Sequence, residues 1–299
     1  MKKILITGSN GLLGQNLVNL LLKEKDTYEV VGVSRGANRS ERKDFAYYDV
    51  DITHKEHLRN LILEVQPNVI VNTAAMTNVD ACEAEKENCL KLNVTAVQYL
   101  VDLALEVNAH LIHISTDFIF DGKNGPYKET DSPNPLNYYG KTKLLSEEVL
   151  TNSTIDTTIL RTILVYGLVA NMSRSNIVLW VKESLENGKT ITIVNDQFRM
   201  PTYVEDLALV CKICIDKKAT GTFHISSNQL LSIYEIAQEV AATFQLDQSL
   251  IQPISTATLN QTAVRPAITG FDLSKTNREL NFYPMPFKED LIRFKELLP

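Results

Sequence analysis

The stretch NYYGKTKLLSEE, residues 137–148, places two tyrosines beside two lysines. A phenol can donate a proton to a carbonyl oxygen when a nearby cation stabilises the phenolate that is left. Tyr138 and Lys141 are three residues apart, whereas Tyr139 and Lys143 are four apart. Both spacings put two side chains on one face of a helix. The stretch therefore predicts an acid–cation pair for carbonyl reduction and offers two candidate pairs.

Helical-wheel positions favour the second pair. Tyr139 and Lys143 share a stripe that continues through Ser146 and Leu150, and we expect this stripe to carry no other charge. Lys141 instead lies one heptad before a glutamate, on a face that we expect to be solvated. A reduction also needs a hydride donor, which no side chain provides, so the rest of the chain must supply a cofactor site.

The elements that would position these residues alternate between strand and helix patterns. Strands are predicted at 2–7, 28–34, 45–52, 68–75, 109–116 and 156–166, and helices at 12–25, 54–65, 85–108 and 138–151. Continuous apolar strands that alternate with helices predict an α/β fold, a Rossmann-type doubly wound parallel sheet. Ligands of such sheets bind at the carboxyl ends of the strands, where we place Gly8, Ala74, Thr116 and Tyr166.

After residue 166 the alternation loosens, which predicts a smaller C-terminal substrate-binding lobe. We assign residues 1–166 plus 201–226 to the cofactor-binding Rossmann domain, because 221–226 has the pattern of one more sheet strand. Residues 167–200 plus 227–299 are assigned to the lobe.

The stretch ITGSNGLLGQNL carries glycines at Gly8, Gly11 and Gly14, directly after a strand and at the start of a helix. Glycines at this point allow a tight turn and let backbone N–H groups approach a pyrophosphate. A plain strand–turn–helix corner is the alternative. We predict a dinucleotide site that also uses Asn10, Leu12 and Leu13.

The end of the second predicted strand indicates which dinucleotide is bound. NAD sites place a carboxylate there for the ribose 2′-hydroxyl, whereas an arginine suits the 2′-phosphate of NADP. This chain has Ser34, Arg35 and Arg39 there and no acid, although Arg35 is also compatible with a solvated loop charge. We predict NADPH, with NADH left open.

Composition narrows the class of protein. In 299 residues, the net charge of −6 argues against nucleic acid or an anionic membrane as the main partner. Apolar runs are all shorter than the ~20 residues that span a bilayer, and ILIT is too short for a signal sequence, so a cytoplasmic location is expected. The four cysteines, which include the pair Cys211 and Cys214 in an apolar helix, are predicted to be buried. The five histidines are scattered, and we predict no metal site.

Longer motifs resemble a known family. The glycine loop, Asn93, the STD at 115–117 and the Y-x-x-x-K at 139–143 resemble the extended short-chain dehydrogenase/reductases. STDFIFDGKNGPYKETDSPNPLNYYGKTKLLSEE, VNTAAMTNVDACE, NDQFRMPT and RPAITGFDLSK resemble the dTDP-4-dehydrorhamnose reductase family over essentially the whole chain. The regulatory β-subunit of methionine adenosyltransferase is a related member that the chain resembles in GTFHISSN and the following helix.

The resemblance implies NADPH-dependent reduction of the 4-keto group of a nucleotide-linked 6-deoxy sugar. Its tyrosine and lysine are four apart, which selects Tyr139 as acid and Lys143 as the supporting cation and ribose contact, and leaves Tyr138 for packing or substrate lining. Thr116 would orient the carbonyl. The remaining residues carried over are Asp51 and Ile52 at the adenine, Ala74, Ala75, Met76 and Asn93 along the cofactor, and Asp117, Leu164 and Arg265 at the substrate.

The chain departs from the family pattern at two points. The family commonly reads R-T-S-W-V-Y-G after the sixth strand, but this chain reads RTILVYG, so that Leu164 replaces a tryptophan that could stack on a sugar. Arg199 stands where a glycine is usual. Two alternatives therefore stay open: an NAD-dependent nucleotide-sugar epimerase or dehydratase, and a non-catalytic NADP-binding regulatory subunit. The family also implies a possible homodimer, and a need for Mg²⁺ is left open.

Overall fold

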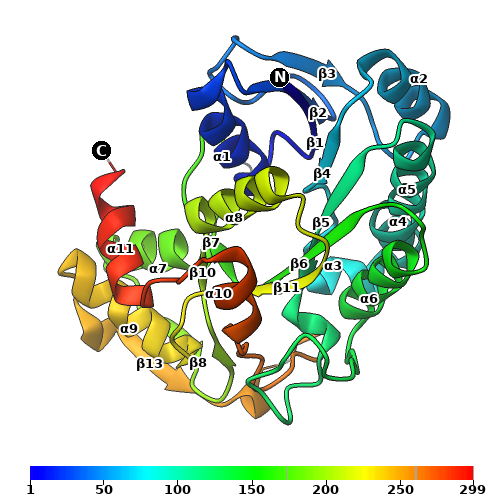
Figure 1. Cartoon of the computed structure of the whole chain (residues 1–299). Coiled ribbons are helices and arrows are strands. Elements are labelled where there is room, and N and C mark those ends of the chain that lie inside the picture. The colour runs from blue at the N-terminus through cyan, green and yellow to red at the C-terminus, as the bar shows by residue number, and fades with distance from the viewer. Residues whose placement is uncertain (173, 260, 299) are drawn as a thin grey trace.

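In the computed structural model, which describes residues 1–172, 174–259 and 261–298, a seven-stranded sheet forms the centre of the molecule (Figure 1). Its strand order is β11-β6-β5-β4-β1-β2-β3, and every neighbouring pair is parallel. The strands are β1 (Lys2–Thr7), β2 (Tyr28–Ser34), β3 (Ala46–Asp49), β4 (Val69–Asn72), β5 (His110–Thr116), β6 (Thr157–Thr162) and β11 (Gly221–Ile225). The predicted doubly wound parallel sheet is confirmed, and 221–225 joins it as predicted.

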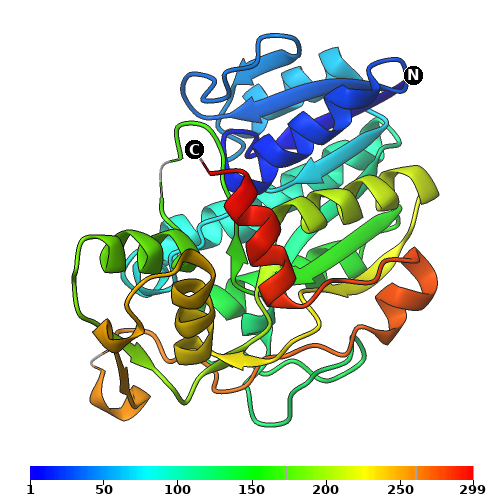
Figure 2. The same cartoon turned by 90° about the vertical axis from the view of Figure 1, so that its left-hand side faces the viewer.

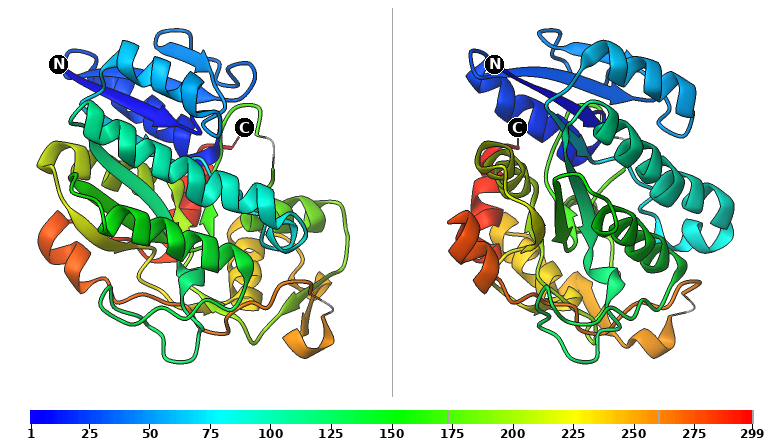
Figure 3. Two further views of the ribbon diagram at one scale, coloured as in Figure 1. Left: turned by 90° about the vertical axis from the view of Figure 1, so that its right-hand side faces the viewer. Right: turned by 45° about the vertical axis from the view of Figure 1, so that its right-hand side comes forward.

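Helices cover both faces of this sheet because its strands are apolar on both sides. One face packs on α1 (Leu12–Leu21), α8 (Val204–Lys217) and the end of α10 (Ser274–Leu280). The other face packs on α2 (Lys55–Val65), α5 (Ala96–Glu106) and α6 (Tyr138–Thr151). Figure 3 shows α5 and α6 running side by side on that second face. Cys211 and Cys214 are buried in α8, as predicted.

A smaller group of elements packs below the sheet around its own apolar cluster (Figure 2). It contains α7 (Ile177–Glu186), α9 (Ile233–Phe244) and α11 (Phe287–Glu296). Short strand pairs complete it: β8 (Ile191–Val194) with β13 (Ile251–Ile254), β9 (Phe198–Arg199) with β12 (Leu231–Ser232), and β7 (Val165–Tyr166) with β10 (Thr202–Tyr203). The α9 helix starts at a capping box between Ser232 and Glu235, which fixes where the chain turns into it.

The predicted strand over 156–166 is wrong in its second half. β6 ends at Thr162, and Leu164 has a φ of +43°, a left-handed conformation that breaks the strand. The Thr202 hydroxyl fills the gap by donating to the Ile163 carbonyl at 2.7 Å. Tyr166 therefore lies in β7, buried in the cluster of α7, α9 and α11, and not at the carboxyl edge of the main sheet.

The predicted helix over 85–108 is also more complex than its periodicity suggested. Within this range the chain forms α4 (Lys86–Leu90), then one π-helical turn over Lys91–Thr95, and then α5; a separate short helix, α3 (Val79–Ala84), precedes it. Such π turns arise where one extra residue is accommodated in a helix, often at functional sites. Here the turn contains Asn93, one of the predicted site residues.

Candidate active site

The glycine loop forms a close corner between β1 and α1. A Cβ atom at Gly14 would lie 2.4 Å from the Gly8 carbonyl oxygen, and one at Gly8 would lie 2.7 Å from the Ala74 nitrogen. Gly8 also has a φ of +69°. Gly11 is the N-cap residue of α1 and the first turn carries no acid, so the N–H groups of Leu12 and Leu13 are suited to an anion. The corner fits a dinucleotide pyrophosphate.

Asn10 ties this loop to the end of β2. Its backbone nitrogen donates to the Ser34 hydroxyl at 3.1 Å, and its side-chain oxygen accepts from the Arg39 nitrogen at 2.9 Å. The Arg35 side chain is 75% exposed, and its guanidinium lies 3.8 Å from the Asp51 carboxylate. Arg35 is thus free to turn toward an anionic group beside the loop. Burial acts to raise the pKa of Asp51, but the hydrogen bonds that its carboxylate accepts from Thr53 outweigh this effect, so the pKa lies below its usual value.

The segment after β4 is held by Asn93. The Asn93 side-chain oxygen accepts from the Met76 nitrogen at 2.8 Å, and its amide nitrogen donates to the Met76 carbonyl at 3.1 Å. The same amide reaches the Thr142 hydroxyl of α6 at 3.2 Å. Asn93 therefore fixes Ala74, Ala75 and Met76, which are half-buried, relative to α6. Ile52, after β3, is buried against the α2 side of the sheet.

The helix α6 presents the predicted pair on its buried face. Asn137 is the N-cap and accepts from the Gly140 nitrogen at 2.8 Å, which sets the start of the helix. Tyr139 and Lys143 are both buried, whereas Lys141 is exposed, as the helical wheel predicted. The expectation that this face carries no further charge is wrong, because Glu147 is buried there too.

Glu147 is charge-compensated by Arg161 of β6. The Arg161 Nη2 atom lies 2.7 Å from Glu147 Oε2, and its Nε atom donates at 3.0 Å to Oε1. Ser115 donates to the same carboxylate. The sequence did not single out this pair, because a glutamate in a helix is normally read as a solvated charge.

Tyr139 and Thr116 lie together at the carboxyl end of β5. Burial raises the pKa of the Tyr139 phenol, and a hydrogen bond with Thr116 acts in the opposite direction. The Thr116 hydroxyl accepts from the Phe118 nitrogen at 3.3 Å and donates to Asp117 at 3.1 Å. A proton donor and a hydroxyl thus meet at one edge of the sheet, near the glycine loop.

Lys143 is buried at the same edge. Its Nζ atom donates to the Ile114 carbonyl at 2.7 Å and lies 2.9 Å from His113 Nε2. Burial lowers the pKa of Lys143 to about 8, although the Glu147 carboxylate opposes this shift. His113 was not among the predicted site residues. Its position at the third residue before Thr116, on a strand leading to the site, was the only signal for it.

A pocket of about 240 Å³ opens beside Thr116, at the boundary with α7 and α9. Its lining includes Asp117, Phe118, Leu164, Arg199 and Arg265. Burial raises the pKa of Asp117, and the Arg199 guanidinium, 3.7 Å from this carboxylate, opposes the shift. Arg265 is held by Asp80 at 2.6 Å. Each of the predicted substrate residues except Thr116 therefore lines this one pocket.

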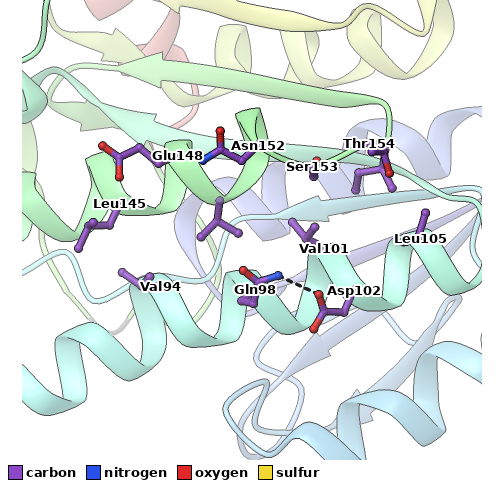
Figure 4. A pocket seen from close by; sticks show the side chains of 12 residues that line it. Val94, Gln98, Val101, Asp102, Leu105, Leu145, Glu148, Asn152, Ser153 and Thr154 are labelled. Atoms are coloured by element: carbon purple, nitrogen blue, oxygen red, sulfur yellow. Dashed lines mark hydrogen bonds between the residues drawn. The ribbon is translucent and has the colours of Figure 1, made fainter.

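A second hollow, of about 490 Å³, lies away from these residues (Figure 4). It is a groove between α5 and α6, lined by Gln98, Asp102, Leu105, Leu145 and Glu148 among others. Its side chains come from the outer faces of the two helices, as Figure 4 shows, and so it has no part in the chemistry of Tyr139.

Comparisons with known proteins identify the family. A family model described as the RmlD substrate binding domain matches residues 1–298. The chain belongs to the RmlD family. It is 34% identical to a dTDP-4-dehydrorhamnose reductase of Aggregatibacter actinomycetemcomitans, over 97% of this chain and 97% of that protein. It is also 34% identical to methionine adenosyltransferase 2 subunit beta of Bos taurus, over 92% of this chain and 81% of that protein.

The fold agrees with solved structures of this RmlD family. The crystal structure of dTDP-4-dehydrorhamnose reductase from Bacillus anthracis in complex with NADP matches with a TM-score of 0.87 at 28% identity, and covers 100% of each chain. In the parts of the chain that the structure describes, no helix is long and apolar enough to cross a membrane. Within the same residues, no cluster of three or more His, Cys, Asp or Glu side chains is placed to bind a metal ion.

Two residues of this pocket, Leu164 and Arg199, stand where the sequence departs from the pattern expected of the family. Leu164 lies where that pattern has an aromatic residue; its backbone is left-handed, and its side chain lines the pocket together with Ile177 of α7. Arg199 is 3% exposed and donates to the carbonyls of Phe198, Pro266 and Ala267. Arg199 therefore links β9 to the segment after residue 265, and its positive charge compensates the carboxylate of Asp117.

Proposed function

We propose that this protein reduces the 4-keto group of a nucleotide-linked 6-deoxy sugar with NADPH, as a dTDP-4-dehydrorhamnose reductase does. The observation that carries this proposal is the meeting of buried Tyr139 and Lys143 with Thr116, at the sheet edge that also holds the glycine loop. Membership of the RmlD family supports it. The product would serve deoxysugar synthesis.

Three side chains perform the proton chemistry in this proposal. The nicotinamide of a bound cofactor would supply the hydride to the ketone carbon. Thr116 donates a hydrogen bond to the ketone oxygen and orients it. The Tyr139 O–H bond breaks and its proton goes to that oxygen, which gives the alcohol. Lys143, as an ammonium, stabilises the phenolate that remains, and this lowers the barrier to proton donation.

The cofactor would bind at the glycine-loop corner between β1 and α1. We propose that the pyrophosphate lies at Gly8, Asn10, Gly11, Leu12, Leu13 and Gly14, that Ser34 and Arg35 contact the 2′-phosphate, and that Asp51 and Ile52 flank the adenine. Ala74, Ala75, Met76 and Asn93 would line the nicotinamide half, with Tyr139 and Lys143. The exposed Arg35 and the absence of an acid at the end of β2 favour NADPH over NADH.

The substrate would enter the pocket of about 240 Å³. Asp117 and Leu164 would contact the sugar, and Arg265, which forms an ion pair with Asp80, would contact the diphosphate. We further propose that residues 167–200 and 227–299 act as the substrate-binding lobe. A homodimer and a cytoplasmic location remain predictions.

The decisive experiment is the loss of NADPH absorbance when the purified protein meets dTDP-4-dehydrorhamnose. We expect turnover in the wild-type protein and a loss of at least 100-fold in kcat with Tyr139→Phe. Tyr138→Phe is the matched control, because Tyr138 is the neighbouring phenol that packs against α3 and should leave kcat within about 3-fold. Equal rates for Tyr139→Phe and the wild type would show that another group supplies the proton.

A second candidate is a regulatory subunit that binds NADP without turnover. The likeness to methionine adenosyltransferase 2 subunit beta favours it, together with Leu164 and Arg199 in the pocket. Tight NADPH binding, no oxidation with any keto sugar and co-purification with an adenosyltransferase would support this reading. An epimerase or dehydratase would instead purify with NAD already bound.

A further inference from the structure

A row of buried polar groups links Lys143 to the strands of the main sheet. It consists of Thr7 on β1, Asn72 on β4, His113 on β5 and Lys143 with Ser146 on α6, and each is at most 1% exposed. The proposed proton chemistry uses only Lys143. Buried polar groups that form a continuous row usually hold one another in a defined protonation state.

The orientation of Asn72 is fixed by its neighbours. Its Oδ1 atom accepts from the Thr7 hydroxyl at 2.6 Å and from the Ala74 nitrogen at 3.3 Å. A backbone N–H can only donate, so Oδ1 must be the atom on that side. The amide Nδ2 of Asn72 therefore faces His113 Nδ1, 3.0 Å away, and donates to it.

This contact selects the tautomer of His113. Since Nδ1 accepts a hydrogen bond, it carries no proton, and the neutral ring must be protonated at Nε2. If the ring carried a proton on both nitrogens, its Nδ1–H group would face the N–H group of the Asn72 amide, and no hydrogen bond could form between them. Burial holds the pKa of His113 well below its usual value, which agrees with a neutral ring.

The Nε2–H group then points at two partners, Ser146 Oγ at 3.1 Å and Lys143 Nζ at 2.9 Å. Ser146 uses its own proton to donate to the Lys143 carbonyl at 2.6 Å. A neutral Lys143 amine accepts from Nε2–H and still donates to the Ile114 carbonyl. An ammonium in the same place has no lone pair to accept this hydrogen bond, so its N–H groups would face the Nε2–H group of His113.

The other charges around Lys143 are few. Glu147, four residues further along α6, favours the ammonium but is engaged with Arg161. Cys89 of α4 is the second group whose charge would favour the ammonium. Tyr139 precedes Lys143 by one turn and is a neutral phenol, because burial raises its pKa. Among these groups, His113 is the one in direct contact with the lysine nitrogen.

We propose that His113 is a positioning residue that favours the neutral amine of Lys143 in the free protein, and that Lys143 leaves His113 and takes up a proton from solvent when the dinucleotide binds. This inference rests on the proposed cofactor site. The proton adds to the Nζ lone pair and no other bond changes. Binding thereby creates the ammonium that the phenolate of Tyr139 needs.

Calorimetry of NADPH binding at pH 8.5, in buffers with different ionisation enthalpies, measures the proton uptake. With the pKa of Lys143 at about 8 in the free protein, we expect uptake of roughly 0.7 proton per NADPH bound. Asn72→Asp places a carboxylate oxygen at His113 Nδ1 and moves the ring proton there. Nε2 then accepts a hydrogen bond from the Lys143 ammonium. Because Lys143 is already protonated before NADPH binds, the proton uptake should fall below roughly 0.2 proton per NADPH.

Ser146→Ala is the matched control. It removes the other partner of Nε2–H without changing the tautomer, so the uptake should remain at the wild-type level. Equal uptake in the wild type and Asn72→Asp, or none in the wild type, would overturn the proposal.

The free protein provides a second measurement that needs no cofactor. Long-range proton–nitrogen NMR of histidine-labelled protein should report His113 as the Nε2–H tautomer in the wild type and as Nδ1–H in Asn72→Asp, with the signal assigned through His113→Asn. An Nδ1–H or doubly protonated His113 in the wild type would also overturn it. If the tautomers are as expected but NADPH does not bind, the proposed function fails and the coupling to binding fails with it, while the holding of Lys143 by His113 stands.

Discussion

The buried pair of Glu147 and Arg161 should be the most sensitive electrostatic contact in the sheet core. Glu147→Gln leaves the shape almost unchanged but removes the carboxylate that compensates Arg161. The two side chains are 5% and 8% exposed, so water cannot replace the lost charge. The change therefore leaves an uncompensated cation between α6 and β6.

The magnitude follows from the geometry. At 2.7 Å and an effective dielectric constant of about 20, the attraction of the pair is roughly 6 kcal/mol before desolvation. Removal of one partner from a buried pair typically costs about 3–5 kcal/mol, because the remaining charge stays buried. We expect Glu147→Gln to lower the free energy of unfolding by about 4 kcal/mol. With a urea slope of about 3 kcal/mol per molar, the midpoint should fall by roughly 1.3 M.

Urea unfolding followed by circular dichroism measures this shift. The matched variant replaces Glu147 and Arg161 together by methionine, which removes both charges. This double variant should lie within about 2 kcal/mol of the wild type, because apolar residues can replace a buried pair at little cost. A loss below 1 kcal/mol for Glu147→Gln, or a double variant as unstable as the single one, would contradict the assignment of charge compensation.

Three further predictions concern other parts of the molecule. Gly14→Ala should weaken NADPH binding at least 10-fold in a fluorescence titration, because its Cβ would lie 2.4 Å from the Gly8 carbonyl oxygen; unchanged affinity would disprove the close-packed corner. Arg35→Ala should weaken NADPH binding by about 5- to 30-fold and leave NADH binding unchanged, whereas equal losses would mean that Arg35 does not contact the 2′-phosphate. Burial, and then the charge of Asp206, raise the pKa of Asp290 to about 7, so stability is lost as the pH rises from about 4 to 7, by at most about 4 kcal/mol. Asp290→Asn should therefore gain melting temperature relative to the wild type between pH 5 and pH 8, and a constant difference would refute this linkage.

Local patterns in the sequence were sufficient for most of the scaffold. The strands β1, β2 and β5 and the helix α6 lie within one residue of their predicted bounds, because short apolar runs and helical periodicity reflect burial on a parallel sheet. The glycine loop was also readable, since Gly8 and Gly14 stand where a side chain would collide with backbone. The choice of Tyr139 and Lys143 over Tyr138 and Lys141 followed from helical-wheel positions and from the family resemblance, because spacing left both pairs open.

The tertiary structure decided which polar groups are buried and what compensates them. Glu147 meets Arg161 14 residues later, and Lys143 meets His113 30 residues earlier. Periodicity cannot anticipate such contacts, because a charged residue is buried only where a partner from another strand or helix removes the cost of desolvation. The break at Leu164 has the same origin: a β-strand pattern continues through it, but the fold brings in the hydroxyl of Thr202, which hydrogen-bonds the Ile163 backbone at the point where the strand ends.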